Sequence, residues 1–104
     1  MVLHVTKWNV IPDKTEAYTE WAKTAIPRIL AGPGVVEFRG YRPASGEHQV
    51  VITLEFADMT AWAAWQSAEE VQALLAESRM YETNVCYELW GPSPIVPVPV
   101  RPGG

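Results

Sequence analysis

The chain has 104 residues, of which 48 % are hydrophobic and 19 % charged, and its formal net charge is -4. This length fits one globular domain, and this composition excludes a disordered chain. The eight Lys and Arg residues are scattered along the chain, so no basic surface that would track nucleic acid is predicted.

The first predicted element is a strand at residues 2–11, because β-branched and aromatic residues alternate there with other types. His4, Thr6 and Trp8 share one face of this strand. The other face carries Leu3, Val5, Lys7 and Asn9. The strand therefore places a histidine and a tryptophan on the same side.

A helix is predicted next, beginning in the segment PDKTE. Asp13 is expected to cap it, and Glu16, three residues later, to complete a capping box. Apolar residues then recur at helical spacing until the segment AGPG at residues 31–34, which is expected to end the helix. Pro27 predicts a kink or a restart inside it, because proline lacks a backbone donor.

Two strands are predicted at residues 35–43 and 48–57, joined as a hairpin by the turn segment ASGE. The second strand has one wholly apolar face, which is expected to lie under the helices. This face carries Val50, Ile52, Leu54 and Phe56.

A second helical region is predicted to start under a cap from Asp58 or Thr60. The segment SAEE gives another start signal, from Ser67 to Glu70, so a break is expected near Ser67. A last strand is predicted at residues 84–91.

The predicted order is strand, helix, strand, strand, helix, strand, the plan of an α+β, ferredoxin-like βαββαβ fold with a four-stranded antiparallel sheet. The helices cover one face of such a sheet, so the other face needs a partner. We expect this uncovered face to carry His4, Thr6, Trp8, Val51, Thr53 and Glu55, together with Glu37, Arg39 and Tyr41. A second copy of the chain, packed sheet on sheet into a dimeric α+β barrel, would cover it and could leave a partly polar cavity.

Residues 1–91 are thus expected to form one domain and residues 92–104 a proline-rich, extended C-terminal tail. The tail carries Ile95, Val96, Val98 and Val100, which are costly to expose to water. We expect it to lie along its own subunit or to reach across to the partner. The alternative is a disordered end.

Several other classes lack support in the sequence. No apolar stretch approaches the ~20 residues that span a bilayer, and the opening residues contain no secretory signal, so a cytoplasmic protein without a membrane partner is expected. Cys86 is the only cysteine, which excludes an intramolecular disulfide, and it is expected to be a small apolar residue. No Cys and His cluster has zinc spacing, so no metal site is predicted.

Two segments resemble a known family. VTKWNVIPDKTEAYTEWA, at residues 5–22, is similar to the opening of the dimeric α+β barrel proteins. VITLEFADMTAWAAWQSAEEVQALL, at residues 51–75, is similar to their third strand and the helical region that follows it. The resemblance covers about residues 2–90 and is to small proteins of the antibiotic-biosynthesis-monooxygenase (ABM) type.

The resemblance implies a range of activities, because this superfamily includes monooxygenases that oxidise polycyclic aromatics without metal or flavin, haem-degrading monooxygenases, isomerases and stress proteins. The helical Trp of the monooxygenases corresponds to Trp65, whereas Ala61 stands where the cofactor-free enzymes have Asn. Leu74 or Leu75 stands where the haem-degrading enzymes have His. Haem ligation in their manner is therefore not expected, and no cofactor is predicted.

Trp62 and Trp65 are three residues apart, so they are neighbours on the predicted helix. One interpretation places both in a buried stripe of the core. The other makes at least one of them line a cavity, because the small residues Ala61, Ala63 and Ala64 leave room for a flat ligand beside an indole.

His4 is the candidate catalytic residue, a general base near neutral pH, with a buried histidine at the dimer interface as the alternative. Glu37 and Arg39 share a strand face and are expected to pair, although Arg39 could anchor a ligand oxyanion. The candidate substrate-binding residues are Trp8, Arg39, Trp62 and Trp65.

The sequence thus predicts a small homodimer that binds an apolar or aromatic molecule, with cofactor-independent monooxygenase activity as one hypothesis. The alternative is a non-catalytic ligand-binding or stress-response protein of the same fold. A solvent-connected pocket beside His4 would favour the first, and a sealed core at Trp62 and Trp65 the second.

Overall fold

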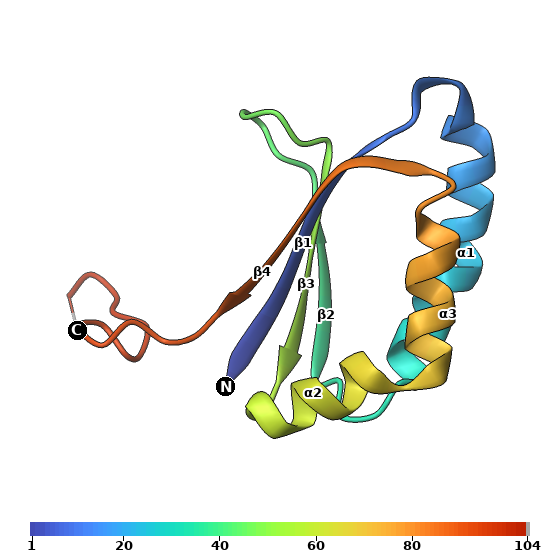
Figure 1. Ribbon diagram of the computed structural model, residues 1–104. Coiled ribbons are helices and arrows are strands. Elements are labelled where there is room, and N and C mark those ends of the chain that lie inside the picture. Colours follow the sequence, from blue (N-terminus) through green and yellow to red (C-terminus); the bar gives the residue numbers. More distant parts are fainter. Residues whose placement is uncertain (104) are drawn as a thin grey trace.

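The computed structural model of the chain describes residues 1–103. Its elements in chain order are β1 (Val2–Val10), a 3-10 turn η1 (Pro12–Lys14), α1 (Thr15–Ala31), β2 (Glu37–Tyr41), β3 (Val50–Phe56), α2 (Met59–Ser67), α3 (Glu69–Ser78) and β4 (Glu82–Trp90). The strands form one antiparallel sheet in the order β2-β3-β1-β4, and the helices all lie on one side of it (Figure 1). The predicted ferredoxin-like α+β fold is confirmed.

The first helix begins differently from the prediction. Because proline favours the first position of a helical turn, the turn starts at Pro12 and takes Asp13 into its interior. The predicted Asp13 cap is therefore wrong, and α1 begins at Thr15 without a side-chain cap. The helix runs through Pro27 without a restart, since its packing against the core outweighs one missing hydrogen bond.

The second helical region matches the prediction except at one cap. Asp58 Oδ1 accepts a hydrogen bond from the Ala61 amide at 2.9 Å, which confirms Asp58 as the cap of α2. The helix ends at Ser67, and α3 begins at Glu69, so the predicted break is also confirmed. The capping box from Ser67 is wrong, because the Ser67 hydroxyl donates back to the Ala64 carbonyl at 3.3 Å.

The faces of the sheet differ from the prediction in one respect. In the register of β1 with β3, His4 lies opposite Leu54 and Thr6 opposite Ile52, so these residues share the face that the helices cover. Placing His4, Thr6 and Trp8 on the uncovered face was therefore wrong. Alternation along a strand shows which residues share a face, but the pairing with the next strand decides which face meets the helices.

The uncovered face, which we call the open face, carries the other predicted residues. The pairs Glu37–Glu55, Arg39–Thr53 and Tyr41–Val51 lie across β2 and β3, and Val5, Glu88 and Trp90 join them from β1 and β4. Lys7 bridges to Glu88 at 3.4 Å on this face. Tyr41 and Trp90 are each about half exposed, so aromatic surface remains open to solvent here.

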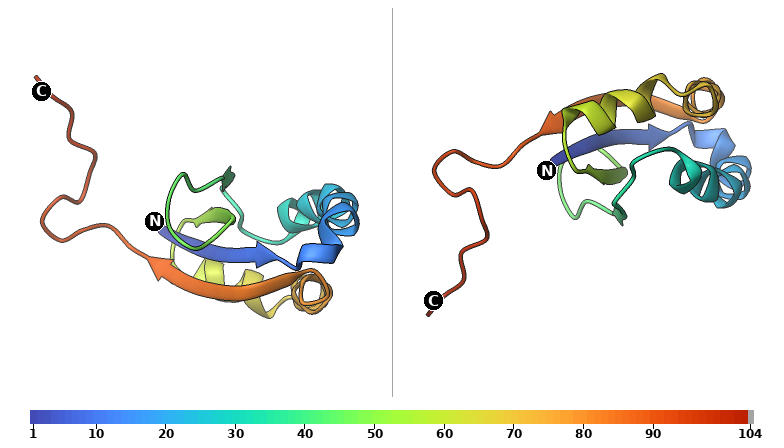
Figure 2. Two further views of the ribbon diagram at one scale, coloured as in Figure 1. Left: turned by 90° about the horizontal axis from the view of Figure 1, so that it is seen from above. Right: turned by 90° about the horizontal axis from the view of Figure 1, so that it is seen from below.

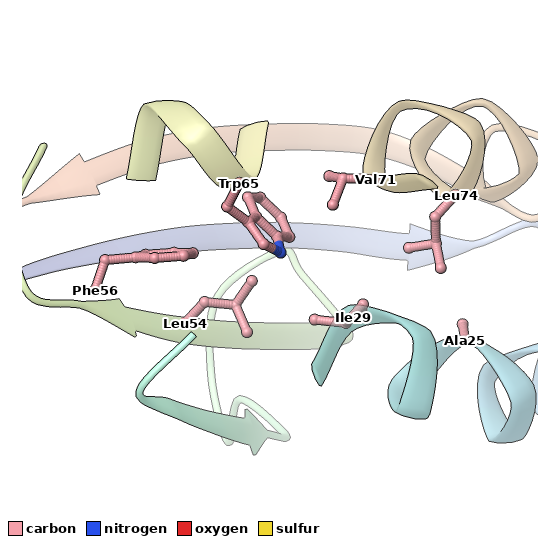
Figure 3. Close-up of a cluster of buried hydrophobic side chains, with 7 residues drawn as sticks. All are labelled: Ala25, Ile29, Leu54, Phe56, Trp65, Val71 and Leu74. Carbon is pink, nitrogen blue, oxygen red and sulfur yellow. The ribbon is translucent and has the colours of Figure 1, made fainter. Parts of the chain in front are cut away.

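The core lies between the sheet and the helices, and α1 and α3 pack against each other farther from the sheet than α2 does (Figures 1 and 2). Figure 3 shows the central cluster, Ala25, Ile29, Leu54, Phe56, Trp65, Val71 and Leu74. Arg28 of α1 donates two hydrogen bonds of 2.8 Å to the Glu77 carboxylate of α3, and the Trp21 indole donates a third at 2.9 Å. These bonds hold the two outer helices together.

After β4 the tail leaves the body on the side away from α1 and α3 (Figures 1 and 2). Ile95 is 88 % exposed and Val100 75 % exposed. The tail therefore does not pack along its own subunit, which was one of the two expected positions. Within residues 1–103 no helix is long and apolar enough to cross a membrane, and the cytoplasmic location stays a prediction.

Candidate functional site

A cleft lies between the helix-covered face of the sheet and α1 and α3. It has a cavity volume of about 100 Å³ and is partly open to solvent. Its wall is almost entirely apolar and rich in aromatic rings: Trp8, Tyr18, Trp21, Phe38, Trp65 and Tyr87. Among the few polar side chains that reach it are His4, Thr6, Ser78 and Glu82. The arrangement is typical of a site for a small apolar molecule.

His4 is held on both sides of its ring. The Trp62 indole Nε1–H donates to His4 Nδ1 at 3.1 Å, and His4 Nε2 lies 3.1 Å from the Thr6 hydroxyl. Because an indole nitrogen can only donate, Nδ1 must be the acceptor, and the proton of the neutral ring is then on Nε2, which donates to Thr6. The fold thus selects one tautomer of His4.

Burial also keeps His4 uncharged. The residue is 5 % exposed, and loss of hydration lowers its pKa from 6.5 to about 4. The Trp65 ring lies edge-on to it at 5.2 Å between ring centroids, and Tyr87 lies 6.1 Å away. At neutral pH His4 is therefore a neutral group in an aromatic surround.

The two tryptophans of α2 have different positions. Trp65 is 2 % exposed, belongs to the core cluster and also forms part of the cleft wall. Trp62 is half-buried and lies behind His4, in an adjoining hollow beside Gln66 and Leu89. Both interpretations from the sequence hold in part for Trp65, because this side chain belongs to the core cluster and also lines the cleft.

The remaining candidates are divided between the two faces of the sheet. Trp8 lines the cleft with His4 and Trp65. Arg39 lies on the open face, where it donates to Glu37 at 2.7 Å and is largely exposed. The expected pairing of Arg39 with Glu37 is observed, and Arg39 is not part of the cleft.

Glu82 is a cleft residue that the sequence did not indicate. Between Lys7 and Asn9 of β1, the pairing with β4 shifts from Cys86 to Thr83, so β4 has one extra residue there. This is a β-bulge, and Asn84 within it has a φ of 53°, in the left-handed region. The bulge reverses the alternation of β4. Glu82 consequently shares the cleft side with Tyr87, although simple alternation would have put it on the open face with Cys86.

The Glu82 carboxyl is perturbed by its surroundings. Burial raises its pKa from 4.5 to about 7, and the Ser78 hydroxyl opposes this only partly. That hydroxyl also donates to the Leu75 carbonyl at 2.7 Å, which limits how far it can stabilise the carboxylate. Burial raises the pKa of Tyr18 and of Tyr87, and the charge of Glu82 adds to both rises. A carboxyl that titrates near neutrality in a cleft is a feature of functional sites.

Two indole donors in this region have no hydrogen-bond partner among residues 1–103, namely Trp8 Nε1 and Trp65 Nε1. Trp65 Nε1 lies under the end of α1, where a Cβ on Gly32 would come within 2.7 Å of it. Within the same residues, no group of three or more His, Cys, Asp or Glu is arranged to hold a metal ion.

The structure is that of a ferredoxin-like α+β protein with an aromatic cleft between its sheet and helices. The sequence profile of the family described as "Antibiotic biosynthesis monooxygenase" matches residues 1–77. Because the match covers well over half of the chain, the chain belongs to this family. No curated protein sequence matches it.

Solved structures with similar folds agree with this assignment. A DABB-family protein with a ferredoxin-like fold from Mesorhizobium loti superposes with a TM-score of 0.80 at 16 % identity, covering 88 % of this chain and 96 % of that one. SnoaB in its N63A mutant form, a cofactor-independent oxygenase from Streptomyces nogalater, gives 0.68 at 19 % identity, covering 86 % and 89 %. A putative antibiotic biosynthesis monooxygenase from Nitrosomonas europaea gives 0.70 at 17 %, covering 88 % and 97 %. At these identities the likeness concerns the fold.

Proposed function

We propose that this protein binds a small, largely apolar aromatic molecule in the cleft beside His4 and oxidises it with molecular oxygen without a cofactor. The observation that carries the proposal is the cleft itself, which is open to solvent and walled by aromatic rings. Family membership supports the reaction class, since the family is described as monooxygenases and one structural relative as a cofactor-independent oxygenase.

The proposed reaction needs no external reductant. A phenol with a free ring position can take one oxygen atom of O₂ to become a quinone, while the other oxygen atom leaves as water with two hydrogens from the substrate. The substrate therefore supplies all the electrons. The protein has to hold the ring, exclude water and accept a proton, and an apolar cleft can provide the first two.

Trp8 and Trp65 are the proposed ring-binding residues, with Trp62 supporting His4 from behind. The role of His4 as the base stays a prediction. Both of its ring nitrogens are hydrogen bonded, so accepting a ligand proton would require Nδ1 to give up its bond with Trp62. Arg39 lies on the open face, so it could contact a ligand only if a second copy of the chain brought a binding site to that face.

The working unit in this proposal is a homodimer packed open face to open face. Half-exposed Tyr41 and Trp90 on that face support it, because aromatic side chains there gain by leaving water. Residues 1–91 would then form the domain, and the tail at residues 92–104 would reach across to the partner. Native mass spectrometry tests both points: a mass of two chains supports the dimer, and a lone monomer contradicts it.

The activity is tested with naphthols as substrates under ¹⁸O₂. We expect one labelled oxygen in the quinone product, and slower turnover in Trp65→Phe than in the wild type, with Tyr81→Phe as the control for a change of an aromatic residue that does not line the cleft. Wild-type protein that binds naphthol without consuming oxygen would contradict the oxygenase. Such a result would instead support the non-catalytic ligand-binding or stress-response protein.

A further inference from the structure

Within residues 1–103, Glu82 is the one carboxyl in the cleft wall, and the proposed reaction does not use it. Among residues 1–103 it forms no ion pair, so no cation compensates its burial. An uncompensated carboxyl at a half-buried position costs stability, whereas an apolar residue there would not. The bulge at Asn84 is what turns it toward the cleft.

The other polar groups of the cleft divide into two sets. His4, Thr6 and Trp62 are joined to one another by hydrogen bonds. Trp8 Nε1, in contrast, is a buried donor that forms no hydrogen bond of normal geometry among residues 1–103, although it lies near enough to the Tyr18 hydroxyl to act against the rise in the pKa of Tyr18 that burial causes. Glu82 therefore offers an acceptor, and Trp8 Nε1 a donor, in a largely apolar wall.

We propose that Glu82 accepts a proton from a neutral one- or two-ring aromatic ligand that carries an acidic hydroxyl group and enters the cleft with that group toward Glu82 and Trp8. In this step the O–H bond of the ligand breaks, and the proton joins a carboxylate oxygen of Glu82. The electron pair stays on the ligand oxygen, to which Trp8 Nε1 then donates a hydrogen bond. This inference rests on the proposed function, since it specifies the ligand of the same cleft.

The surroundings of Glu82 suit this role. A pKa of about 7 makes its carboxylate a stronger base than an ordinary one, while leaving it ionised above neutral pH. The titratable groups that feel the charge of Glu82 are Tyr18 from α1 and Tyr87 from its own strand, and His4 of β1 lines the same cleft. The two tyrosines and the buried His4 are uncharged near pH 7, so Glu82 is the group of this set that ionises there.

The test uses 2-naphthol, whose excited state is strongly acidic and transfers its proton only to an acceptor in contact with the hydroxyl. The full-length protein is kept in excess, so that all naphthol is bound, and excitation is set beyond indole absorption. We expect naphtholate emission that rises with pH and is half complete near pH 7. Glu82→Gln should lose this emission, while Glu69→Gln, which removes an exposed carboxyl from α3, should retain it.

Binding is measured separately with 2-methoxynaphthalene, which has no proton to give. Wild type and Glu82→Gln should bind this ether equally well, which also shows that the variant is folded. If the ether and the naphthol both fail to bind the wild type, the proposed function is wrong, and this inference falls with it. If naphthol binds but its naphtholate emission survives in Glu82→Gln, or is lost instead in His4→Gln with ether binding intact, Glu82 is not the acceptor.

Discussion

Trp62 Nε1 donates a hydrogen bond to His4 Nδ1 across 58 positions of sequence, at 3.1 Å. The bond favours the neutral imidazole, because a protonated Nδ1 would face the indole N–H with a second donor. Trp62→Phe removes the donor. We expect the pKa of His4 to rise above its value of about 4 and the stability to fall by about 1–2 kcal/mol, since a buried acceptor is left unpaired.

The measurement is a ¹⁵N NMR titration of the His4 ring, with chemical unfolding for the stability. Trp90→Phe is the matched control, because the Trp90 indole donates to Glu88 on the open face at 2.8 Å. That variant should leave the His4 titration unchanged. A wild-type spectrum with the His4 proton on Nδ1 would contradict the bond from Trp62.

His4 and Glu82 should give the stability opposite dependences on pH. The folded protein depresses the pKa of His4 from 6.5 to about 4, so the unfolded chain binds more protons between these values and stability falls as pH falls through them. The pKa of Glu82 is raised from 4.5 to about 7, so the folded chain binds more protons there and stability falls as pH rises. In the overlapping range, from 4.5 to 6.5, the two effects oppose each other.

Single variants should separate the two effects. Glu82→Gln leaves the dependence of His4, so its free energy of unfolding should decrease as pH falls from 6.5 to 4. His4→Gln leaves that of Glu82, and its stability should decrease as pH rises from 4.5 to 7. Urea unfolding at half-unit steps of pH measures both. Parallel profiles for the two variants would show that these groups do not titrate as their burial requires.

Most of the fold could be predicted from the sequence, because the signals for strands, helices and caps lie within a few neighbouring residues. Alternation placed Val50 and Leu54 on a buried face, and Asp58 marked the start of α2. The face of His4 could not be obtained in this way, because it depends on the register between β1 and β3.

The candidate site was predicted in part for the same reason. The sequence singled out Trp8, Trp65 and His4 as candidate site residues by their chemistry, and the structure brings them together in one cleft. Glu82 was missed because a bulge at Asn84 changes the alternation of β4, and Asn is only a weak signal for the left-handed backbone. An asparagine at the start of the predicted strand, two residues after a glutamate, was the one available indication.

Glu77 should stabilise the pairing of α1 and α3 only while it is ionised. Two hydrogen bonds from Arg28 and, to a smaller extent, one from the Trp21 indole lower the pKa of this carboxyl from 4.5 to about 2. Its contribution is therefore complete above pH 4.5 and is lost as pH falls toward 2. Glu77→Gln should lower the melting temperature at neutral pH and reduce the decline of stability on the acid side.

Thermal unfolding followed from neutral pH to pH 2.5 measures this effect. Glu20→Gln is the control, because Glu20 pairs with Lys23 at 3.3 Å on the exposed surface of α1, where such pairs contribute little. It should leave the melting temperature almost unchanged. Equal losses in the two variants would mean that the contact with Arg28 and Trp21 adds nothing beyond an ordinary surface charge.

Gly32 should be needed for the position of Trp65. A Cβ at Gly32 would lie 2.6 Å from Trp65 Cδ1, closer than real contacts allow, although its φ of -66° is open to any residue. Gly32→Ala should therefore push the indole out of the core cluster and cost about 1–3 kcal/mol, as overpacking does. Gly40→Ala is the matched control, because a Cβ at Gly40 meets no atom within 4 Å.

Trp65 also lines the cleft, so Gly32→Ala should weaken 2-methoxynaphthalene binding as well as stability, while Gly40→Ala changes neither. A stable Gly32→Ala protein with unaltered ether binding would show that the Trp65 indole keeps its position despite the added Cβ, and would contradict the prediction.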